Sequence, residues 1–140
     1  MIQDDSNSFV QLIRADFENN VKNIDIDLLK NIEYDKYACI IFSDYEKGFI
    51  THKAVSEVVK KFKGPIIVDS KKRDLSCFEN CIIKINKYEE SQIEKMPNIC
   101  DLIVTTGKDG AIWNNKVFNA AHSSNIVDIC GAGDVFLTGL

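Results

Sequence analysis

Apolar and polar positions follow one another along the chain in blocks that predict alternating strands and helices. Apolar runs such as YACIIF and GPIIVDS are typical of buried strands, whereas THKAVSEVVKKF predicts an amphipathic helix with Thr51 as its N-cap. Another helix is expected to begin near Asn23 or Asp25. The predicted strands are residues 9–17, 37–42, 64–70, 80–86 and 100–106, and the predicted helices are residues 25–32, 51–62 and 87–96.

The alternation of short strands with helices is the pattern of an α/β fold whose sheet is partly parallel and flanked by helices. After residue 106 the pattern changes, because Asp109-Gly110 and Asn114-Asn115 separate short apolar runs, as in a β-hairpin or meander. A last helix is expected to start within GAGDVFLTGL. No repeat, low-complexity tract or linker divides the chain, so we expect one domain over residues 1–140.

In parallel sheets ligands bind at the carboxyl ends of the strands, so the loops that follow the strands are the places to look for a site. The segment Gly131-Ala132-Gly133 lets backbone N–H groups approach an anion closely, and the helix that follows adds its positive N-terminal end. Asp134 stands in the first turn, where its carboxylate could take a proton from an attacking hydroxyl. The alternative is a tight turn in which Asp134 only favours the helix dipole.

Two other loops carry residues that suit a phosphate or a metal. Asn86 and Glu89 are three positions apart at a strand-to-helix junction, on one face of the first helical turn. There they could hold a hydrated Mg2+ ion, but the same spacing is that of a capping box. The loop of residues 105–110 offers glycines and hydroxyl donors, although Lys-Asp-Gly is also an ordinary turn. Its candidate residues are Thr105, Gly107 and Gly110.

The loop of residues 43–48 follows a buried strand and is rich in hydrogen-bond donors and acceptors, which suits a polyhydroxylated ligand or its phosphate. Asp44 and Lys47 are its candidates, and Lys71 stands at the end of the next strand. The alternative for these residues is a solvated loop. Neither the P-loop pattern nor the dinucleotide fingerprint is present, so a phosphate site here would have to be of another type.

Composition narrows the classes of function. The chain is 45% hydrophobic and 27% charged, with a formal net charge of −4, which favours neither nucleic acid nor an anionic membrane surface as a partner. Its longest apolar runs fall well short of the ~20 residues of a membrane helix, and its acidic N-terminus is unlike a signal peptide, so we expect a cytoplasmic protein. The five cysteines form no C-x-x-C pair and the two histidines stand at no metal-ligand spacing, so no zinc site is expected.

Taken together, these loops resemble the motifs of a known family. D-x-x-G-A-G-D before a helix resembles the second signature of the ribokinase-like, or PfkB, carbohydrate kinases. N-x-x-E at residues 86–89 and T-x-G-x-x-G at residues 105–110 are similar to two further motifs of that family, in the same order. SDYEKG at residues 43–48, LIRADFE at residues 12–18 and VDSKK at residues 68–72 resemble stretches of the heptose 7-phosphate kinases, the kinase half of the bifunctional ADP-heptose synthases.

The resemblance implies a role for each candidate. Asp134 would be the catalytic base, and Asn86 and Glu89 would help to place Mg2+ and phosphate. ATP and Mg2+ are thus the expected cofactors, and a sugar phosphate is the expected substrate. The remaining implied residues are Gly131, Ala132 and Gly133 for the anion hole, Asn86, Thr105, Gly107 and Gly110 for the nucleotide, and Asp44, Lys47 and Lys71 for the sugar phosphate.

The chain departs from the family's pattern at several positions. Ser70 stands where the heptose kinases usually have proline, Ile85 where proline usually precedes the asparagine, and Ile129-Cys130 where threonine is common. These differences leave the identity of the sugar open more than the chemistry.

The resemblance covers only the middle portion of the family's fold, so we expect an incomplete ribokinase-like domain without turnover of its own. Two alternatives remain open. One is a nonenzymatic protein that binds a sugar phosphate or a nucleotide. The other is a structural fragment that associates through an apolar surface, for which a homodimer is the expected assembly.

Overall fold

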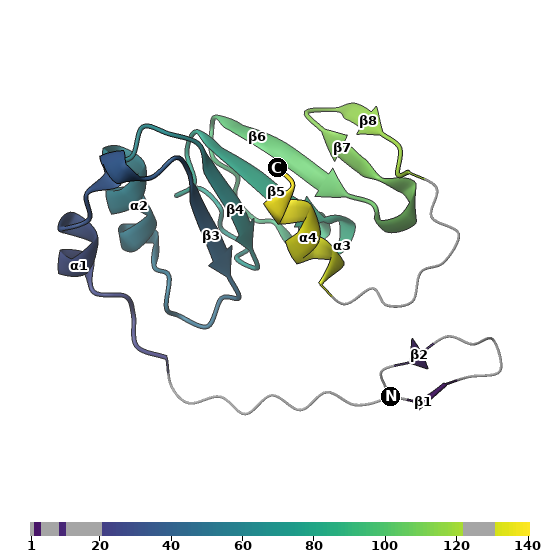
Figure 1. Cartoon of the computed structure of the whole chain (residues 1–140), viewed down its shortest axis with the longest axis horizontal. Helices are drawn as coiled ribbons and strands as arrows, with labels where there is room; N and C mark the ends of the chain where they lie inside the picture. Colours follow the sequence, from purple (N-terminus) through teal and green to yellow (C-terminus); the bar gives the residue numbers. More distant parts are fainter. Residues whose placement is uncertain (1, 4–8, 11–20, 122–130) are drawn as a thin grey trace. The chain divides into compact units, whose positions relative to one another are not determined.

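The structure is a computed structural model that describes residues 2–3, 9–10, 21–121 and 131–140 (Figure 1). The chain divides into two compact units, one of residues 21–120 and one that combines residues 1–20 with residues 121–140, and each is described by itself. The prediction of a single partial domain over the whole chain stays a prediction. In the described part of the chain, no helix has the length and apolar character needed to cross a membrane.

The larger unit is built on a six-stranded sheet with the strand order β3-β4-β5-β6-β7-β8 (Figure 1). The strands β3 to β6 are parallel to one another, and β7 and β8 add to the sheet as antiparallel strands. This confirms the predicted α/β fold with a partly parallel sheet, and the arrangement is consistent with part of a ribokinase-like fold. The strands are β3 (Ile40–Asp44), β4 (Ile66–Ser70), β5 (Cys81–Asn86), β6 (Cys100–Thr105), β7 (Ala111–Trp113) and β8 (Lys116–Phe118).

The helices begin where the sequence predicts. Asp25 caps α1 by accepting a hydrogen bond from the Asp27 N–H, and the Thr51 hydroxyl oxygen caps α2 by accepting one from the Ala54 N–H. The helix α3 ends at Gln92, earlier than predicted, because Ile93 takes an extended conformation and packs against the core. The helical segments of this unit are α1 (Ile26–Lys30), η1 (Tyr34–Lys36), α2 (His52–Lys61), α3 (Lys87–Gln92) and η2 (Gly107–Asp109).

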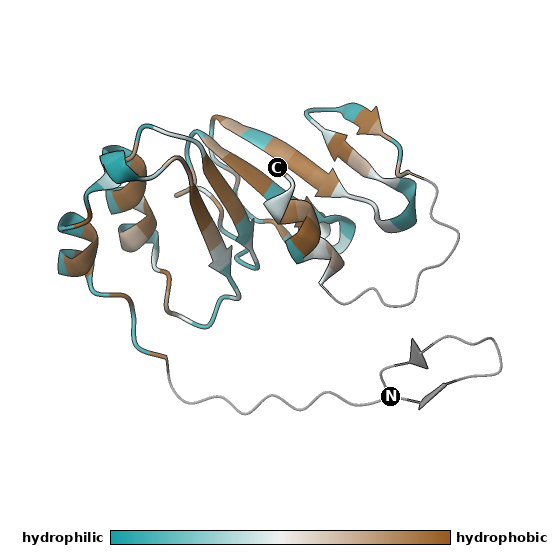
Figure 2. Ribbon diagram, in the orientation of Figure 1, coloured by the Kyte–Doolittle hydropathy of each residue, from teal (hydrophilic) through white to brown (hydrophobic). Residues whose placement is uncertain are grey.

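The core lies where alternate strand residues meet α2 and the connection from β4 to β5. Figure 2 shows the apolar residues of these strands in brown. That connection contains no helix, yet it supplies Leu75 and Phe78, both fully buried. The Phe78 ring packs edge-on against Phe42 of β3, with 5.7 Å between ring centroids. The loop after β4 is thereby anchored in the core, although it carries no regular structure.

The hairpin predicted after residue 106 is confirmed. Asn114 and Asn115 connect β7 to β8 with φ angles of 46° and 66°, the left-handed conformations that asparagine tolerates in tight hairpin turns. Gly110 instead closes η2 with a φ of 111°. A Cβ atom at Gly110 would clash with the Phe118 carbonyl oxygen, so only glycine fits there.

The smaller unit is described only in part. β1 (Ile2–Gln3) pairs antiparallel with β2 (Phe9–Val10), which is the beginning of the strand predicted for residues 9–17. The helix α4 (Ala132–Thr138) starts at the predicted place, with Gly131 as its N-cap at a φ of 77°. The remainder of the predicted strand, the LIRADFE stretch and residues 128–130 lie outside the described residues.

Two thiols of the sheet region are held in their neutral form. Burial raises the pKa of Cys77 to about 11 and that of Cys81 to about 12. Both folded-state values lie above 9.0, the ordinary value, so the folded chain holds these protons to higher pH than the unfolded chain does.

We expect the free energy of unfolding to fall as the pH rises from about 9 toward about 11, because the thiols of the unfolded chain ionise first. Urea unfolding at pH 8, 9.5 and 10.5 measures this loss. The variant Cys77→Ala/Cys81→Ala is the control, since lysine and tyrosine residues also titrate in this range. An equally steep loss in the variant would contradict the role of the thiols.

Candidate functional site

The ends of four neighbouring strands bring the predicted loops of the larger unit to one edge of the sheet. Asp44 ends β3 and pairs in register with Ser70 at the end of β4, while Asn86 ends β5 and pairs with Thr105 at the end of β6. Because these strands are parallel, their carboxyl ends lie at the same edge. This is the edge at which α/β sheets bind ligands.

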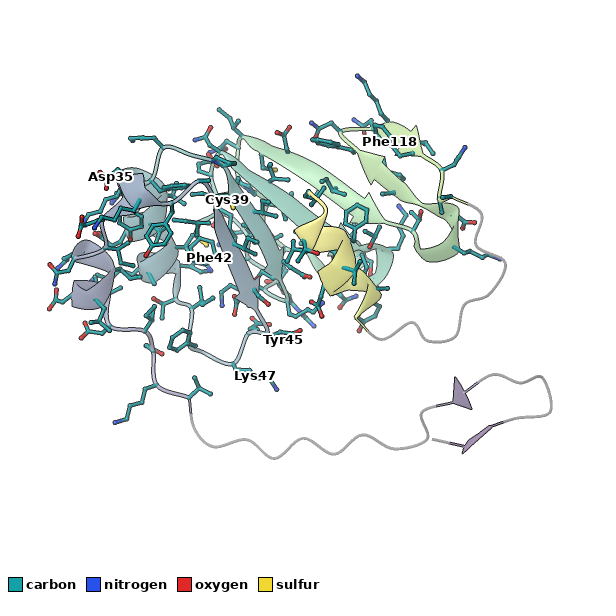
Figure 3. The ribbon with its side chains drawn as sticks, in the orientation of Figure 1. Asp35, Cys39, Phe42, Tyr45, Lys47 and Phe118 are labelled. Carbon is teal, nitrogen blue, oxygen red and sulfur yellow. The ribbon has the colours of Figure 1, made fainter. Side chains whose placement is uncertain are left out.

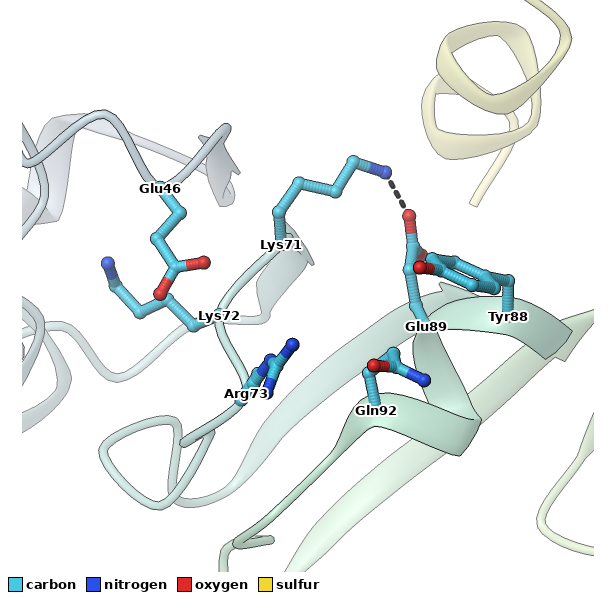
Figure 4. Close-up of a pocket in the computed structure, with 7 residues that line it drawn as sticks. All are labelled: Glu46, Lys71, Lys72, Arg73, Tyr88, Glu89 and Gln92. Carbon is cyan, nitrogen blue, oxygen red and sulfur yellow. Dashed lines mark hydrogen bonds and ion pairs between the residues drawn. The ribbon is translucent and has the colours of Figure 1, made fainter.

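Asn86 and Glu89 form the capping box that the sequence allowed. The Asn86 side-chain oxygen accepts a hydrogen bond from the Glu89 N–H at 2.8 Å, and Glu89 Oε2 accepts one from the Asn86 N–H at 2.8 Å. The second carboxylate oxygen, Oε1, accepts a hydrogen bond from Lys71 Nζ (Figure 4). Glu89 thus fixes the start of α3 with one oxygen and holds a cation with the other.

Lys71 also faces Asp69, whose Oδ1 lies 3.9 Å from Lys71 Nζ. The other oxygen of Asp69, Oδ2, accepts a hydrogen bond of 2.8 Å from Lys84, a lysine that is nearly fully buried in the middle of β5. Burial acts to lower the pKa of Lys71, but the hydrogen bond and charge of Glu89, together with the charge of Asp69, outweigh it and raise that pKa. Lys71 is therefore a cation at neutral pH.

A hollow of about 440 Å³ opens between the loop after β4 and α3 (Figure 4). Its wall contains three consecutive basic residues and two glutamates. The basic side chains pair with carboxylates of the chain, namely Glu89, Asp44 and Glu94, so an anionic ligand would have to exchange for these partners. Of the residues in this wall, only Lys71 and Glu89 were predicted as site residues, although the basic run at residues 71–73 is a signal for the two that follow Lys71. The lining residues are Glu46, Lys71, Lys72, Arg73, Tyr88, Glu89 and Gln92.

Asp44 is engaged in contacts within the chain. Its Oδ1 accepts a hydrogen bond from the Glu46 N–H at 3.0 Å, and its Oδ2 accepts one from the Ser70 hydroxyl at 3.0 Å and pairs with Lys72 Nζ at 3.0 Å. Only 4% of Asp44 is exposed, so the carboxylate ties the loop after β3 to the loop after β4. Proline could not supply the hydroxyl of Ser70, so the residue that departs from the family's pattern completes this contact. The sugar-phosphate role of Asp44 stays a prediction.

The other candidates of the larger unit lie on the loop after β3, at the end of β6 and in the turn that follows it. Lys47 lies two positions after Tyr45 on the exposed loop that follows β3 (Figure 3). The Thr105 hydroxyl donates a hydrogen bond to the Ile85 carbonyl oxygen at 3.3 Å, and the Thr106 N–H donates one to the Gly110 carbonyl oxygen at 2.8 Å, which closes the turn that contains Gly107. The contacts of Thr105 and Gly110 are structural, and their nucleotide-binding roles stay predictions.

Asp134 lies in the first turn of α4, as predicted. Gly131 precedes it in a left-handed conformation, and the Val135 N–H donates a hydrogen bond of 2.9 Å to the Gly131 carbonyl oxygen, which closes the first helical turn over Ala132 and Gly133. Because α4 belongs to the smaller unit, its grouping with Asn86 and Glu89 into one site stays a prediction.

No group of three or more histidine, cysteine, aspartate or glutamate residues within the described ranges could hold a metal ion directly. Mg2+ keeps several water molecules and needs only one or two carboxylates from the protein. Glu89 Oε1, which faces the Lys71 ammonium at the hollow, has the chemistry that such a hydrated ion requires.

Substitutions at Asn86 test whether this residue stabilises the chain as the cap of α3, as the capping-box interpretation requires. Asn86→Ala should lower the free energy of unfolding by about 1 kcal/mol, whereas Asn86→Asp, which keeps an N-cap acceptor, should stay close to the wild type. Urea unfolding at neutral pH measures both variants. Equal losses in the two variants would show that capping is not what Asn86 contributes to stability.

Comparison with known proteins places the chain among relatives. No family model matches it. The chain is 33% identical over 134 residues to the uncharacterized protein MJ1336 of Methanocaldococcus jannaschii, and the similarity covers 90% of each protein. It is 28% identical over 156 residues to the bifunctional protein HldE of Haemophilus influenzae and 29% identical over 159 residues to that of Vibrio cholerae, which covers 93% of this chain and 33% of each relative.

The fold and these similarities define an α/β protein that is distantly related to the bifunctional HldE proteins. The chain spans about a third of the length of those relatives. At 33% identity over nearly the whole of both proteins, the chain belongs to the family of MJ1336.

Proposed function

We propose that this chain is part of an ATP-dependent carbohydrate kinase that phosphorylates a sugar or sugar phosphate, and that the substrate is heptose 7-phosphate, phosphorylated at its anomeric hydroxyl. The observation that carries the proposal is the joining of Lys71, Glu89 and Asn86 at the carboxyl edge of the sheet, next to a hollow whose wall contains three consecutive basic residues. The order of the kinase-like motifs and the distant relation to the HldE proteins support it.

Phosphoryl transfer needs mainly positioning and the neutralisation of charge. Because Lys71 is joined to Glu89, we move it from the sugar-phosphate role that the resemblance implies to the ATP side, where it would bind an oxygen of the transferred phosphoryl group. The backbone N–H groups of Gly131, Ala132 and Gly133 would stabilise the charge that develops on that group. Asp134 would take the proton from the sugar hydroxyl as that oxygen attacks. Mg2+, when bound through Glu89, would neutralise charge on the phosphate oxygens.

Calorimetric titration of the protein with ATP and MgCl2 tests the first part of this proposal. We expect Lys71→Met to weaken ATP binding by about tenfold or more, since a hydrogen bond to a charged group is worth about 1.5–3 kcal/mol. Lys87→Met is the matched control, because Lys87 pairs with Glu90 on the exposed side of α3.

Failure of the protein to bind ATP would contradict the proposed function. A phosphorus NMR assay with heptose 7-phosphate and a protein that carries the whole kinase fold then tests the transfer itself, with heptose 1,7-bisphosphate as the expected product. ATP binding without transfer by a protein that carries the whole kinase fold would favour the nonenzymatic alternative.

A further inference from the structure

The Lys71 ammonium has two carboxylate neighbours, Glu89 and Asp69, at unequal distances. It is hydrogen-bonded to Glu89 Oε1 and stands 3.9 Å from Asp69 Oδ1, which is too far for a hydrogen bond. Asp69 Oδ1 is itself buried and has no hydrogen-bond partner. A buried acceptor left without a donor costs about 1–3 kcal/mol, so a charged donor that reached this oxygen would be held firmly.

Asp69 is fixed in place from its other side. Lys84 is its register partner on the neighbouring strand, and the two side chains are joined by a 2.8 Å hydrogen bond. The Lys84 side chain is only 5% exposed, and both residues stand on central strands of the sheet. Asp69 therefore presents Oδ1 at a constant position, whichever way Lys71 turns.

Lys71 can reach that oxygen with a small movement. A charge-assisted hydrogen bond of about 2.8 Å requires the ammonium to approach Asp69 by about 1 Å. The Lys71 side chain is 40% exposed and has a flexible four-carbon stem, so the surrounding structure leaves room for this shift.

We infer that Asp69, positioned by Lys84, is a second acceptor for the Lys71 ammonium and keeps Lys71 in the hollow when another cation takes Glu89. Glu89 can then exchange Lys71 for a divalent cation while the positive charge of Lys71 stays beside the ligand. Lys71 has both acceptors in the chain without any ligand. Only the identity of the cation that replaces Lys71 at Glu89 rests on the proposed function. Asp69 and Lys84 are thus positioning residues that act through Lys71.

NMR observation of the lysine side-chain ammonium groups in the free chain tests this inference without any ligand. We expect Lys71 to stay hydrogen-bonded in Glu89→Gln, because Asp69 takes over, and its ammonium protons to exchange with water about tenfold faster only when Asp69→Asn is added. Lys84→Met in the Glu89→Gln background should also speed exchange, since Asp69 loses its support. Glu90→Gln, which removes the partner of Lys87, is the control for a lost surface pair.

Release of Lys71 in Glu89→Gln alone, to the same extent as in the double variant, would overturn the inference. Asp69→Asn keeps the size and shape of the side chain but leaves the buried Lys84 without its carboxylate, so circular dichroism first checks that the double variant is folded. Glu89→Gln alone leaves the Asp69–Lys84 pair intact and keeps the inference falsifiable. MgCl2 alone, added to the wild-type chain, is then expected to move the Lys71 signals toward their positions in Glu89→Gln. If Mg2+ leaves these signals unchanged while the double variant releases Lys71, the proposed Mg2+ role of Glu89 fails and the second acceptor stands.

Discussion

Replacing Asp134 by asparagine is expected to lower the proposed sugar phosphorylation, measured in a protein that carries the whole kinase fold, by about 100-fold to 10,000-fold, the usual range for the loss of a general base. The amide has the shape of the carboxylate but cannot take the proton of the attacking hydroxyl. ATP binding should stay close to the wild type, because Asp134 is assigned to the hydroxyl and not to the nucleotide. Steady-state rates and calorimetric ATP titrations of the two proteins measure these two effects.

Asp27→Asn is the matched control for this experiment, since Asp27 is the acidic residue in the first turn of α1 and is assigned neither binding nor proton transfer. The loss of the Asp134 charge from the first turn of α4 should itself cost only about 0.3–1 kcal/mol of helix stability. Turnover near the wild-type rate in Asp134→Asn would refute the assignment of the base.

Phe78→Ala is expected to lower the free energy of unfolding by about 3–5 kcal/mol, the usual cost of removing a buried phenyl ring. Phe78 is fully buried and packs against Phe42, so the variant leaves a cavity between β3 and the connection from β4 to β5. Urea unfolding followed by circular dichroism gives the difference. Tyr88→Ala, at a position 74% exposed, should change stability by no more than about 0.5 kcal/mol.

A loss in Phe78→Ala as small as that in Tyr88→Ala would show that this part of the core is not packed as described. The packing of Phe78 also affects the wall of the hollow. Lys71 and Arg73 lie on the same connection as Phe78, so the ring anchors the segment that presents the basic residues.

The strands and helix starts of the larger unit could be predicted from the sequence because their causes are local. Apolar runs of strand length predict β4, β5 and β6, and the hydroxyl of Thr51 predicts the start of α2. The end of α3 could not be placed, because Ile93 leaves the helix to reach a core formed by residues distant in sequence. The cap formed by Asn86 and Glu89 could be predicted from their three-residue spacing, since a capping box is contained within one helical turn.

The residues that could not be predicted from the sequence are those whose partners are distant along the chain. Lys84 looks like an interruption of the apolar run CIIKIN, and only the register of β4 and β5 brings it to Asp69. The same holds for Ser70, whose hydroxyl reaches Asp44 on the neighbouring strand. A charged residue in the middle of a buried strand is a signal for a buried partner, but it does not say which partner.

The backbone of Gly110 affects how genetic data on this protein should be interpreted. A selection for loss of function would recover Gly110 substitutions whether or not the turn binds a nucleotide, because any side chain there collides with the Phe118 carbonyl. Gly107 is the informative position of the pair. A Cβ atom at Gly107 meets nothing within 4 Å, and its φ of 64° is one that asparagine tolerates. A Gly107→Asn allele that abolished activity in a stable protein would therefore report on the ligand and not on the fold.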